Sequence, residues 1–363
     1  MPLNLPLFRR LMRRVVTSGE VDVWSRSERQ WTLCPPSTAH VAPAIFPPGA
    51  IEKIRTLSPW RSWAVEAPLI HGGTLQLGPT RACLLRDVDI VGGHLYCGPA
   101  MAAEGLGKPG VWLKPEHRHQ TIEHGHLVST LSGTRFFGCL LLDDFPLSLL
   151  APASDLQLSL VSNPYTHEAQ YRALVGLGSK ITVARARIRE LMHYEDPAFN
   201  ASKVERYRVL RERLRLGVGA QGGFTSRGVY IRRGLSGERR VLANEPDLES
   251  ALVRQGFTVL DPTHLSALEI ARCCQDAPIV ISVEGSQISH AIFSMADDAA
   301  LVVLQPPDRF GMAYKEFTDG LGMRFAFVVG NAVAEGFTID MTELLHVLDQ
   351  LDRATSPEAR AIA

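Results

Sequence analysis

The sequence lacks a net charge, and it lacks any long apolar run. Its 38 lysines and arginines balance 38 aspartates and glutamates. No overall field therefore attracts nucleic acid, and any affinity for anions must come from local clusters. No apolar run reaches the length of about 18 residues that crosses a bilayer. These absences exclude a membrane-spanning chain, and we expect a cytoplasmic protein with no nucleic-acid partner.

Paired cysteines and a secretion signal are also missing. The six cysteines form no CxxC pair, which is typical of free thiols in a reducing compartment. The N-terminus has no secretory apolar core. Instead, Leu7, Phe8, Leu11 and Val15 are interspersed with four arginines. This short basic amphipathic segment predicts either peripheral contact with the inner face of a membrane or a solvated start of the chain.

The composition is that of an ordinary soluble protein with room for two domains. Of the 363 residues, 45% are apolar and 21% are charged, which suffices for two cores. Residues 20–125 have a β-rich pattern with a Gly92-Gly93 hairpin signal. Residues 127–200 are mixed α/β, and an amphipathic pattern predicts a long linking helix over 201–216. The expected division is an N-terminal domain over 1–215, a C-terminal domain over 217–335, and a last helix within 336–363 that packs back on the N-terminal domain.

After residue 217, strands and helices alternate regularly. This alternation predicts a parallel sheet with helices on both faces, and it places the chain in the α/β class. The expected strands are 228–232, 257–260, 278–283, 300–304 and 324–328, and the expected helices are 245–255, 264–275, 286–296, 312–320 and 341–351.

Two strand ends in this region carry groups suited to an anion. The strand ending at Val283 turns through Glu284-Gly285-Ser286 into a predicted helix, so backbone N–H groups and the helix dipole face the space above the strand. The strand ending at Ile231 is followed by Arg232 and Arg233. Strand alternation sends only one of these arginines inward. The two ends together predict a phosphate-binding edge of the sheet.

More polar residues follow the arginine pair. Arg240 adds a guanidinium group which, together with Arg232, suits a diphosphate because each group offers paired donors. Asn244 and Glu245 come next in the chain. Asn244 is interpreted as an N-cap of the helix over 245–255, as an anchor of the ligand loop, or as both.

The glycine turn has three neighbours of interest. The N–H groups after Gly285 can take phosphate, with Ser286 and Gln287 beside them. Ser286 is alternatively a plain N-cap. Glu284 is badly placed for phosphate, and its carboxylate better suits the hydroxyls of a ribose or of an acceptor.

Two other patterns favour structural interpretations. Gly217-x-Gly219-x-x-Gly222 follows a helix and precedes a strand, which is the reverse of the dinucleotide fingerprint, so it predicts a hinge. Two His-x-His pairs offer metal-ligand nitrogens. No carboxylate or cysteine at the usual spacing completes a set, which favours an exposed polar loop, and no bound metal is expected. The histidines are His117, His119, His124 and His126.

The ordered set of motifs over about residues 228–330 resembles glycosyltransferase family 61, with a fainter similarity over 83–150. That family includes capsule and lipopolysaccharide enzymes as well as plant and animal transferases. The residues that carry the resemblance are Tyr230-Ile-Arg-Arg233, Arg240-x-x-x-Asn244-Glu245, Gly256-Phe257, Asp261-Pro262, Val283-Glu-Gly-Ser-Gln-Ile-Ser-His290 and Phe293.

The resemblance implies a GT-B arrangement, in which two Rossmann-like domains face each other across a cleft and the C-terminal one holds the nucleotide sugar. It also implies an inverting reaction that needs no bound metal, because basic side chains take over the diphosphate.

The resemblance further suggests a general base. The family's segment Asn-Tyr-Gly-His-Trp-x-x-Asp-x-x-Pro corresponds here to the run from Phe136 to Pro146. The family's aspartate is Asp143, which becomes the candidate base for the acceptor hydroxyl. Cys139 replaces the family's histidine, and Glu284 stands where many members have histidine, so Glu284 is the alternative base. Asp144, Cys139 and His290 are assigned to acceptor contact or to structure.

The sequence therefore predicts an inverting, metal-independent glycosyltransferase. Its partners would be a nucleotide sugar and a glycan or glycolipid acceptor of surface polysaccharide biosynthesis, and it would need no cofactor. The alternatives are a non-catalytic nucleotide- or glycan-binding protein on the same fold, and a metal-dependent hydrolase that uses the histidine cluster.

Overall fold

The computed structural model describes residues 22–106, 120–161, 163–220, 222–234 and 240–355. The basic N-terminal segment, His117 and His119 lie outside the described residues. The chain forms two compact units, each discontinuous in sequence. We call them the N-terminal unit (Met1–Pro36 and Gly78–Arg206) and the C-terminal unit (Ser37–Leu77 and Tyr207–Ala363).

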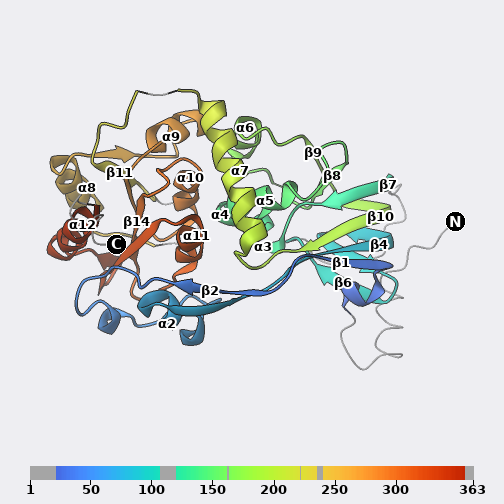
Figure 1. The fold of residues 1–363 in the computed structure, drawn as a ribbon, viewed down its shortest axis with the longest axis horizontal. Coiled ribbons are helices and arrows are strands. Elements are labelled where there is room, and N and C mark those ends of the chain that lie inside the picture. The colour runs from blue at the N-terminus through green and yellow to red at the C-terminus, as the bar shows by residue number, and fades with distance from the viewer. Residues whose placement is uncertain (1–21, 107–119, 162, 221, 235–239, 356–363) are drawn as a thin grey trace. The chain divides into compact units, whose positions relative to one another are not determined.

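The N-terminal unit is built on a mixed eight-stranded sheet (Figure 1). Two long strands, β4 (Thr80–Val91) and β10 (Arg185–Glu195), pair antiparallel in its middle. On the far side of β10 the sheet continues in parallel through β7, β8 and β9. The remaining strands are β1 (Arg29–Cys34), β5 (His94–Cys97), β6 (Ala100–Ala103), β7 (Gln120–Leu127), β8 (Gln157–Ser159) and β9 (Lys180–Thr182).

The predicted Gly92-Gly93 hairpin is present between β4 and β5. Both glycines have positive φ, 56° and 76°, as a two-residue turn of this kind requires. A Cβ atom at Gly93 would lie 2.7 Å from the backbone carbon of Gly105, so a side chain cannot be accommodated there.

Short helices cover one stretch of this unit. A π-helix, η3 (Leu140–Asp144), stands between α4 (Phe137–Cys139) and α5 (Phe145–Ser148). Single π-turns of this kind are rare in proteins, and those that occur often lie at functional sites. The other helical elements are η1 (Val23–Arg26), α3 (Leu131–Arg135) and α6 (Glu168–Leu174).

The predicted linking helix is α7 (Ala201–Val218). Its residues up to Arg206 belong to the N-terminal unit, and those from Tyr207 on belong to the C-terminal unit. Gly219 follows with φ 83°, and its N–H donates to the Arg215 carbonyl, so this glycine ends the helix in the usual way.

The C-terminal unit contains a five-stranded, fully parallel sheet in the order β12-β11-β13-β14-β15. The five predicted strands are all confirmed, and the protein belongs to the α/β class. Apolar residues of every strand contribute to one buried core. The strands are β11 (Gly228–Ile231), β12 (Phe257–Leu260), β13 (Ile279–Val283), β14 (Ala300–Gln305) and β15 (Arg324–Val329).

The helices of this unit agree with the pattern except after β13. There the expected helix over 286–296 is only a 3₁₀ turn, η4 (Ser286–Ile288), followed by the short α10 (Ser289–Ile292). The contribution of a helix dipole at this point is therefore smaller than expected. The other elements are α8 (Glu245–Arg254), α9 (Ala267–Cys274), α11 (Ala313–Leu321), α12 (Met341–Thr355), β16 (Asn331–Val333) and β17 (Gly336–Thr338).

The last helix and an early segment both differ from the expected division. Leu344, Val347 and Leu348 of α12 belong to the core beneath β13–β15, so the apolar face of α12 completes the C-terminal unit. Residues 37–77 also belong to this unit rather than to the first 215 residues.

The early segment joins the C-terminal sheet at its edge. Ile45 N–H donates to the Phe325 carbonyl at 3.0 Å, and Phe327 N–H donates to the Ile45 carbonyl at 2.9 Å. These bonds cover part of the open edge of β15, which would otherwise expose unpaired backbone groups. The segment contains β2 (Ser37–Val41), η2 (Ile51–Lys53), α2 (Trp63–His71) and β3 (Gly73–Leu77). Within the described part of the chain, no helix is long and apolar enough to cross a membrane.

Candidate functional site

The two predicted anion-binding strand ends are neighbours in the C-terminal sheet. β11 and β13 pair directly, with Ile231 opposite Ser282. From β11 the chain turns to one side to form β12, and from β13 it continues to the other side, so the strand order reverses between them. Open α/β sheets bind ligands at such a switch point, beyond the carboxyl ends of the strands.

Of the two adjacent arginines, Arg233 turns toward the second strand end. Its side chain is buried, with 6% of the residue exposed. Its Nη1 donates to the Glu284 carbonyl at 3.2 Å and to Gln287 Oε1 at 3.0 Å. The sequence favoured Arg232 for this position.

Arg232 instead binds two carboxylates elsewhere in the unit. Its Nε donates to Glu249 Oε1 at 2.6 Å, and its Nη1 donates to Asp261 Oδ2 at 3.3 Å. These ion pairs satisfy the guanidinium group of Arg232 within the protein, whereas Arg233 lies at the switch point.

Arg240 brings a second guanidinium group to the same place. Its Nη1 donates to the Glu284 carbonyl at 3.2 Å, the same oxygen that Arg233 contacts, and its Nε lies 3.0 Å from Glu284 Oε2. Burial, followed by the charge of Arg240, lowers the pKa of Arg233 to about 10. Arg233 remains ionised at neutral pH, and the guanidinium group of Arg240 lies with it next to one carboxylate.

Gly285 is required by the position of Arg233. Its φ is +154°, and a Cβ atom there would lie 1.6 Å from Arg233 Nη1. The Tyr314 hydroxyl donates to the Gly285 carbonyl at 2.8 Å and thereby fixes the turn. Glycine thus permits the guanidinium group to lie directly against the backbone.

Gln287 ties the two strand ends to each other. Its Nε2 donates to Ser282 Oγ at 2.9 Å, while Ser282 Oγ donates to the Ile231 carbonyl at 2.7 Å. Because Gln287 Oε1 also accepts from Arg233, this amide orients the guanidinium group. Ser286 is the first residue of the 3₁₀ turn and Gly285 is its N-cap, so the interpretation of Ser286 as an N-cap was wrong. His290 is buried in α10.

Asn244 and Glu245 support the site rather than line it. Asn244 occupies the N-cap position of α8 without a side-chain cap bond; it exchanges two hydrogen bonds with the backbone of Ile339, at 2.9 and 3.0 Å. Glu245 Oε1 accepts from the Tyr230 hydroxyl at 2.7 Å. Burial raises the pKa of Glu245. Both side chains hold the start of α8 in place.

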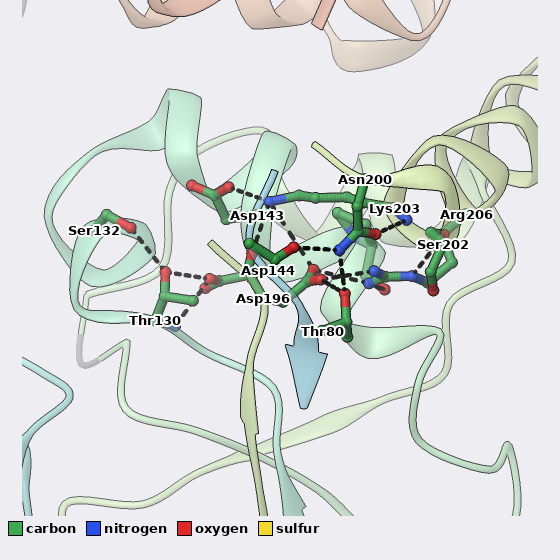
Figure 2. Close-up of polar contacts among 12 residues, drawn as sticks. Thr80, Thr130, Ser132, Asp143, Asp144, Asp196, Asn200, Ser202, Lys203 and Arg206 are labelled. Atoms are coloured by element: carbon green, nitrogen blue, oxygen red, sulfur yellow. Dashed lines mark hydrogen bonds and ion pairs between the residues drawn. The ribbon is translucent and has the colours of Figure 1, made fainter. Parts of the chain in front are cut away.

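The second set of candidate residues lies in the N-terminal unit, on the π-helix η3 (Figure 2). Asp143 Oδ1 accepts from Lys203 Nζ at 2.8 Å. The side chain of Asp143 is 26% exposed, whereas that of Lys203 is only 2% exposed. A buried ammonium group thus orients a carboxylate that remains open to solvent.

Lys203 is itself held by a polar network that the sequence did not indicate (Figure 2). Its Nζ also donates to the Asp196 carbonyl at 3.2 Å, and Asp196 forms a two-bond ion pair with Arg206. Asn200 Oδ1 accepts from the Lys203 N–H, while Asn200 Nδ2 donates to Thr80 Oγ1. The one local signal was Asn200, an N-cap residue three positions before Lys203.

Asp144 has a structural environment. Its Oδ1 accepts from the Thr130 N–H at 2.9 Å and from Thr130 Oγ1 at 2.8 Å. A Cβ atom at Gly133 would lie 2.3 Å from the Asp144 carboxylate. Burial raises the pKa of Asp144 well above its usual range. Of the two adjacent aspartates, only Asp143 can therefore meet a solvent-borne acceptor.

Cys139 stands beside Asp143, where the resembling family has histidine. Burial raises the pKa of the Cys139 thiol, and the carboxylate of Asp143 raises it further. The thiol is therefore neutral at physiological pH, and it is a weak hydrogen-bond donor rather than a base.

The C-terminal unit is thus an α/β domain with two guanidinium groups, those of Arg233 and Arg240, at the switch point of a parallel sheet. Comparison with known proteins identifies a family for the part of the chain that carries these residues. The family model "Glycosyltransferase 61" matches residues 125–302, a span that includes η3 and both strand ends. This match supports glycosyltransferase family 61 and, with it, glycosyltransferase activity. No curated protein matches the chain.

Proposed function

We propose that the protein transfers a sugar from a nucleotide-sugar donor to a hydroxyl group with inversion at the anomeric carbon. The observation that carries this proposal is the convergence of Arg233 and Arg240 on the carbonyl of Glu284, at the switch point of the sheet. Two guanidinium groups on one atom match the paired oxygens of a diphosphate. The backbone around Gly285 and Ser286 adds N–H donors.

We propose that donor binding needs no metal ion. In many phosphate sites a divalent cation offsets the charge of the diphosphate, and here Arg233 and Arg240 supply two positive charges for that task. Turnover that survives treatment with EDTA would support this part of the proposal, whereas loss of donor binding on chelation would contradict it.

Asp143 is the proposed general base. Its exposed carboxylate can take the proton of the acceptor hydroxyl, and Lys203 keeps that carboxylate in one orientation. Glu284 is the second candidate for this role, but its carboxylate lies 3.0 Å from Arg240 Nε. We therefore assign Glu284 to orienting Arg240 and to contacting hydroxyls of the sugar or acceptor.

The two units would divide the work as in GT-B enzymes. The C-terminal unit would bind the nucleotide sugar, and the N-terminal unit would supply the base to the acceptor. The proposed acceptor is a glycan or glycolipid of surface polysaccharide biosynthesis, used in the cytoplasm or at the inner face of a membrane.

Nucleoside diphosphates test the donor site directly. Calorimetric titration with UDP, GDP, ADP and CDP would identify the preferred nucleobase of the donor. Arg240→Gln would then remove one guanidinium group from the site. A charge-assisted hydrogen bond contributes about 1.5–3 kcal/mol, so we expect affinity to fall by roughly tenfold to a hundredfold. Arg232→Gln is the matched control, since its carboxylate partners lie elsewhere, and it should leave the affinity unchanged. The reverse result would overturn the assignment.

Measurements of turnover test whether Asp143 is the general base. Asp143→Asn should lower kcat by about 10² to 10⁴ and leave the dissociation constant of the diphosphate unchanged. NMR of the product would show the anomeric configuration, and retention of the donor's configuration would rule out the inverting mechanism. Full turnover by Asp143→Asn would make Glu284 the better candidate.

A further inference from the structure

Three potential metal-ligand side chains converge in the N-terminal unit, on residues that take no part in the proposed transfer. His124 and His126 lie two residues apart on β7 and therefore on one face of the sheet. Asp155 precedes β8, the parallel neighbour of β7, with which His126 is in register at Gln157. The ligand atoms of these three side chains lie within 4.8 Å of one another.

The three ligand atoms form a triangle of about the size of one face of a tetrahedral metal site. His124 Nε2 and His126 Nε2 lie 3.1 Å apart, His126 Nε2 and Asp155 Oδ2 lie 3.0 Å apart, and His124 Nε2 and Asp155 Oδ2 lie 3.6 Å apart. In tetrahedral zinc sites with bonds of about 2.0–2.1 Å, neighbouring ligand atoms are separated by roughly 3.3 Å. The observed triangle is close to that size.

The outer nitrogens of both rings have partners that set their protons. His124 Nδ1 lies 3.4 Å from Glu190 Oε2, and because a carboxylate only accepts, that nitrogen carries the proton. His126 Nδ1 lies 2.6 Å from the Tyr194 hydroxyl, and this nitrogen carries the proton when the hydroxyl donates to the Leu150 carbonyl at 3.4 Å. Both inner Nε2 atoms then present lone pairs.

Lone pairs that face a carboxylate oxygen repel it unless a cation lies between them. A metal ion satisfies all three atoms at once, and each ring then has an outer hydrogen-bond partner, as ligating histidines usually do.

The carboxylates around the cluster are held as well. Ser154 Oγ donates to Asp155 Oδ1 at 2.9 Å, which leaves Oδ2 directed at the histidines. Arg86 binds Oε1 of Glu190 and thereby orients the carboxylate next to His124. The side chain of His124 is 41% exposed, so a bound ion would be reachable from solvent and could keep a water molecule as its fourth ligand.

We propose that His124, His126 and Asp155 form a binding site for one divalent ion of the zinc class, with an open coordination position. Two imidazoles and one carboxylate suit zinc better than magnesium or calcium, which prefer oxygen ligands alone. The sequence predicted no metal, because Asp155 lies 29 positions from His126 and no local spacing reveals it. The site is independent of the proposed donor site in the C-terminal unit.

Zinc itself is the probe. The full-length, tag-free protein would be stripped with a chelator and dialysed against Zn²⁺. Elemental analysis would give the stoichiometry, and competition with a chromophoric chelator would give the affinity. We expect one Zn²⁺ per chain. Co²⁺ in its place should give the intense visible absorption of a tetrahedral site.

Three variants and one control decide the matter. Asp155→Asn and His124→Ala each remove a ligand and should weaken Zn²⁺ binding at least a hundredfold, beyond the roughly 10- to 100-fold effect of outer partners. Tyr194→Phe removes only the hydroxyl that orients His126, and should show that smaller effect. His264→Ala removes a histidine that is 82% exposed in the C-terminal unit, and should leave binding unchanged.

Circular dichroism would first show that each variant is folded. Unchanged zinc affinity in both Asp155→Asn and His124→Ala would overturn the proposal, as would a stripped wild-type protein that takes up no zinc at micromolar concentration. Neither result depends on catalytic turnover, so this site can fail while the proposed function stands.

Discussion

Replacement of Lys203 by methionine tests whether a buried ammonium group orients the proposed base. The methionine keeps most of the length of the side chain and removes its charge. At the observed separation of 2.8 Å from Asp143 Oδ1, the Coulomb attraction amounts to ~6 kcal/mol at an effective dielectric constant of 20 and to ~1.5 kcal/mol in water. Asp143 is partly exposed, and relief of the ammonium group's desolvation offsets part of the loss. The coupling should therefore lie near the lower figure.

A double-mutant cycle measures this coupling. By urea unfolding we expect Lys203→Met to cost ~3 kcal/mol, because the bond to the Asp196 carbonyl is lost too, and Asp143→Asn to cost ~1.5 kcal/mol. The double variant should cost about as much as Lys203→Met alone, which gives a coupling energy of ~1.5 kcal/mol. Lys180→Met, which breaks the buried pair with Glu168 in the same unit, is the control for loss of a buried cation.

Turnover separates orientation from simple stability. Lys203→Met should lower kcat at a temperature where the variant is fully folded, and it should leave diphosphate affinity unchanged. Lys180→Met should lower stability without lowering kcat. Additive unfolding energies in the cycle, or equal turnover in Lys203→Met and the wild type, would show that Lys203 does not position Asp143.

Three further predictions concern single residues. Because burial raises the pKa of Asp144, the folded state keeps a proton that the unfolded state releases above a pKa of about 3.9. Stability should fall as pH rises above that value, and Asp144→Asn should shrink the difference between urea midpoints at pH 5 and pH 8. Glu284→Gln should bind the nucleoside diphosphate at least as tightly as the wild type by calorimetry, because it removes the negative charge beside Arg240; weaker binding would show that the carboxylate's hold on Arg240 matters more. Gly285→Ala should weaken the same binding at least tenfold, because the new methyl group displaces Arg233, and wild-type affinity would contradict the proposed role of that arginine.

The C-terminal sheet could be predicted because its signals are local. Each strand is a short apolar run that ends at a turn residue, and residues 279–283 are buried without exception. The central strand β10 of the other unit was not predicted. Its sequence is rich in charge, and those charges pair with residues about a hundred positions away, such as Glu190 with Arg86 and Arg189 with Asp87. The alternation of apolar and polar residues within the segment does not reveal such a strand, because the partners of its charged side chains lie in a distant segment.

The same limit applies to the arginines. That one of Arg232 and Arg233 turns inward follows from strand alternation. Which one does so depends on Glu249 and Asp261, two carboxylates that hold Arg232 to α8 and to the end of β12. These partners come from later elements, and their position becomes visible only once α8 and β12 are folded against β11. That an arginine from the end of β11 turns toward the end of β13 was therefore predictable, whereas which arginine of the pair does so was not.

Cys139 stands where the family's motif has a histidine, and this difference affects how the proposed base, Asp143, can pass on its proton. In the family's motif a histidine at this position offers an imidazole that can receive or share a proton. Here the thiol stays protonated, because burial and Asp143 both raise its pKa, so it cannot relay a proton away from the carboxylate. Lys203 does not replace that function either, since an ammonium group only donates. If Asp143 is the base, as we propose, the proton that it takes must therefore leave from its exposed side to solvent, and the base would be a single carboxylate that a buried cation orients.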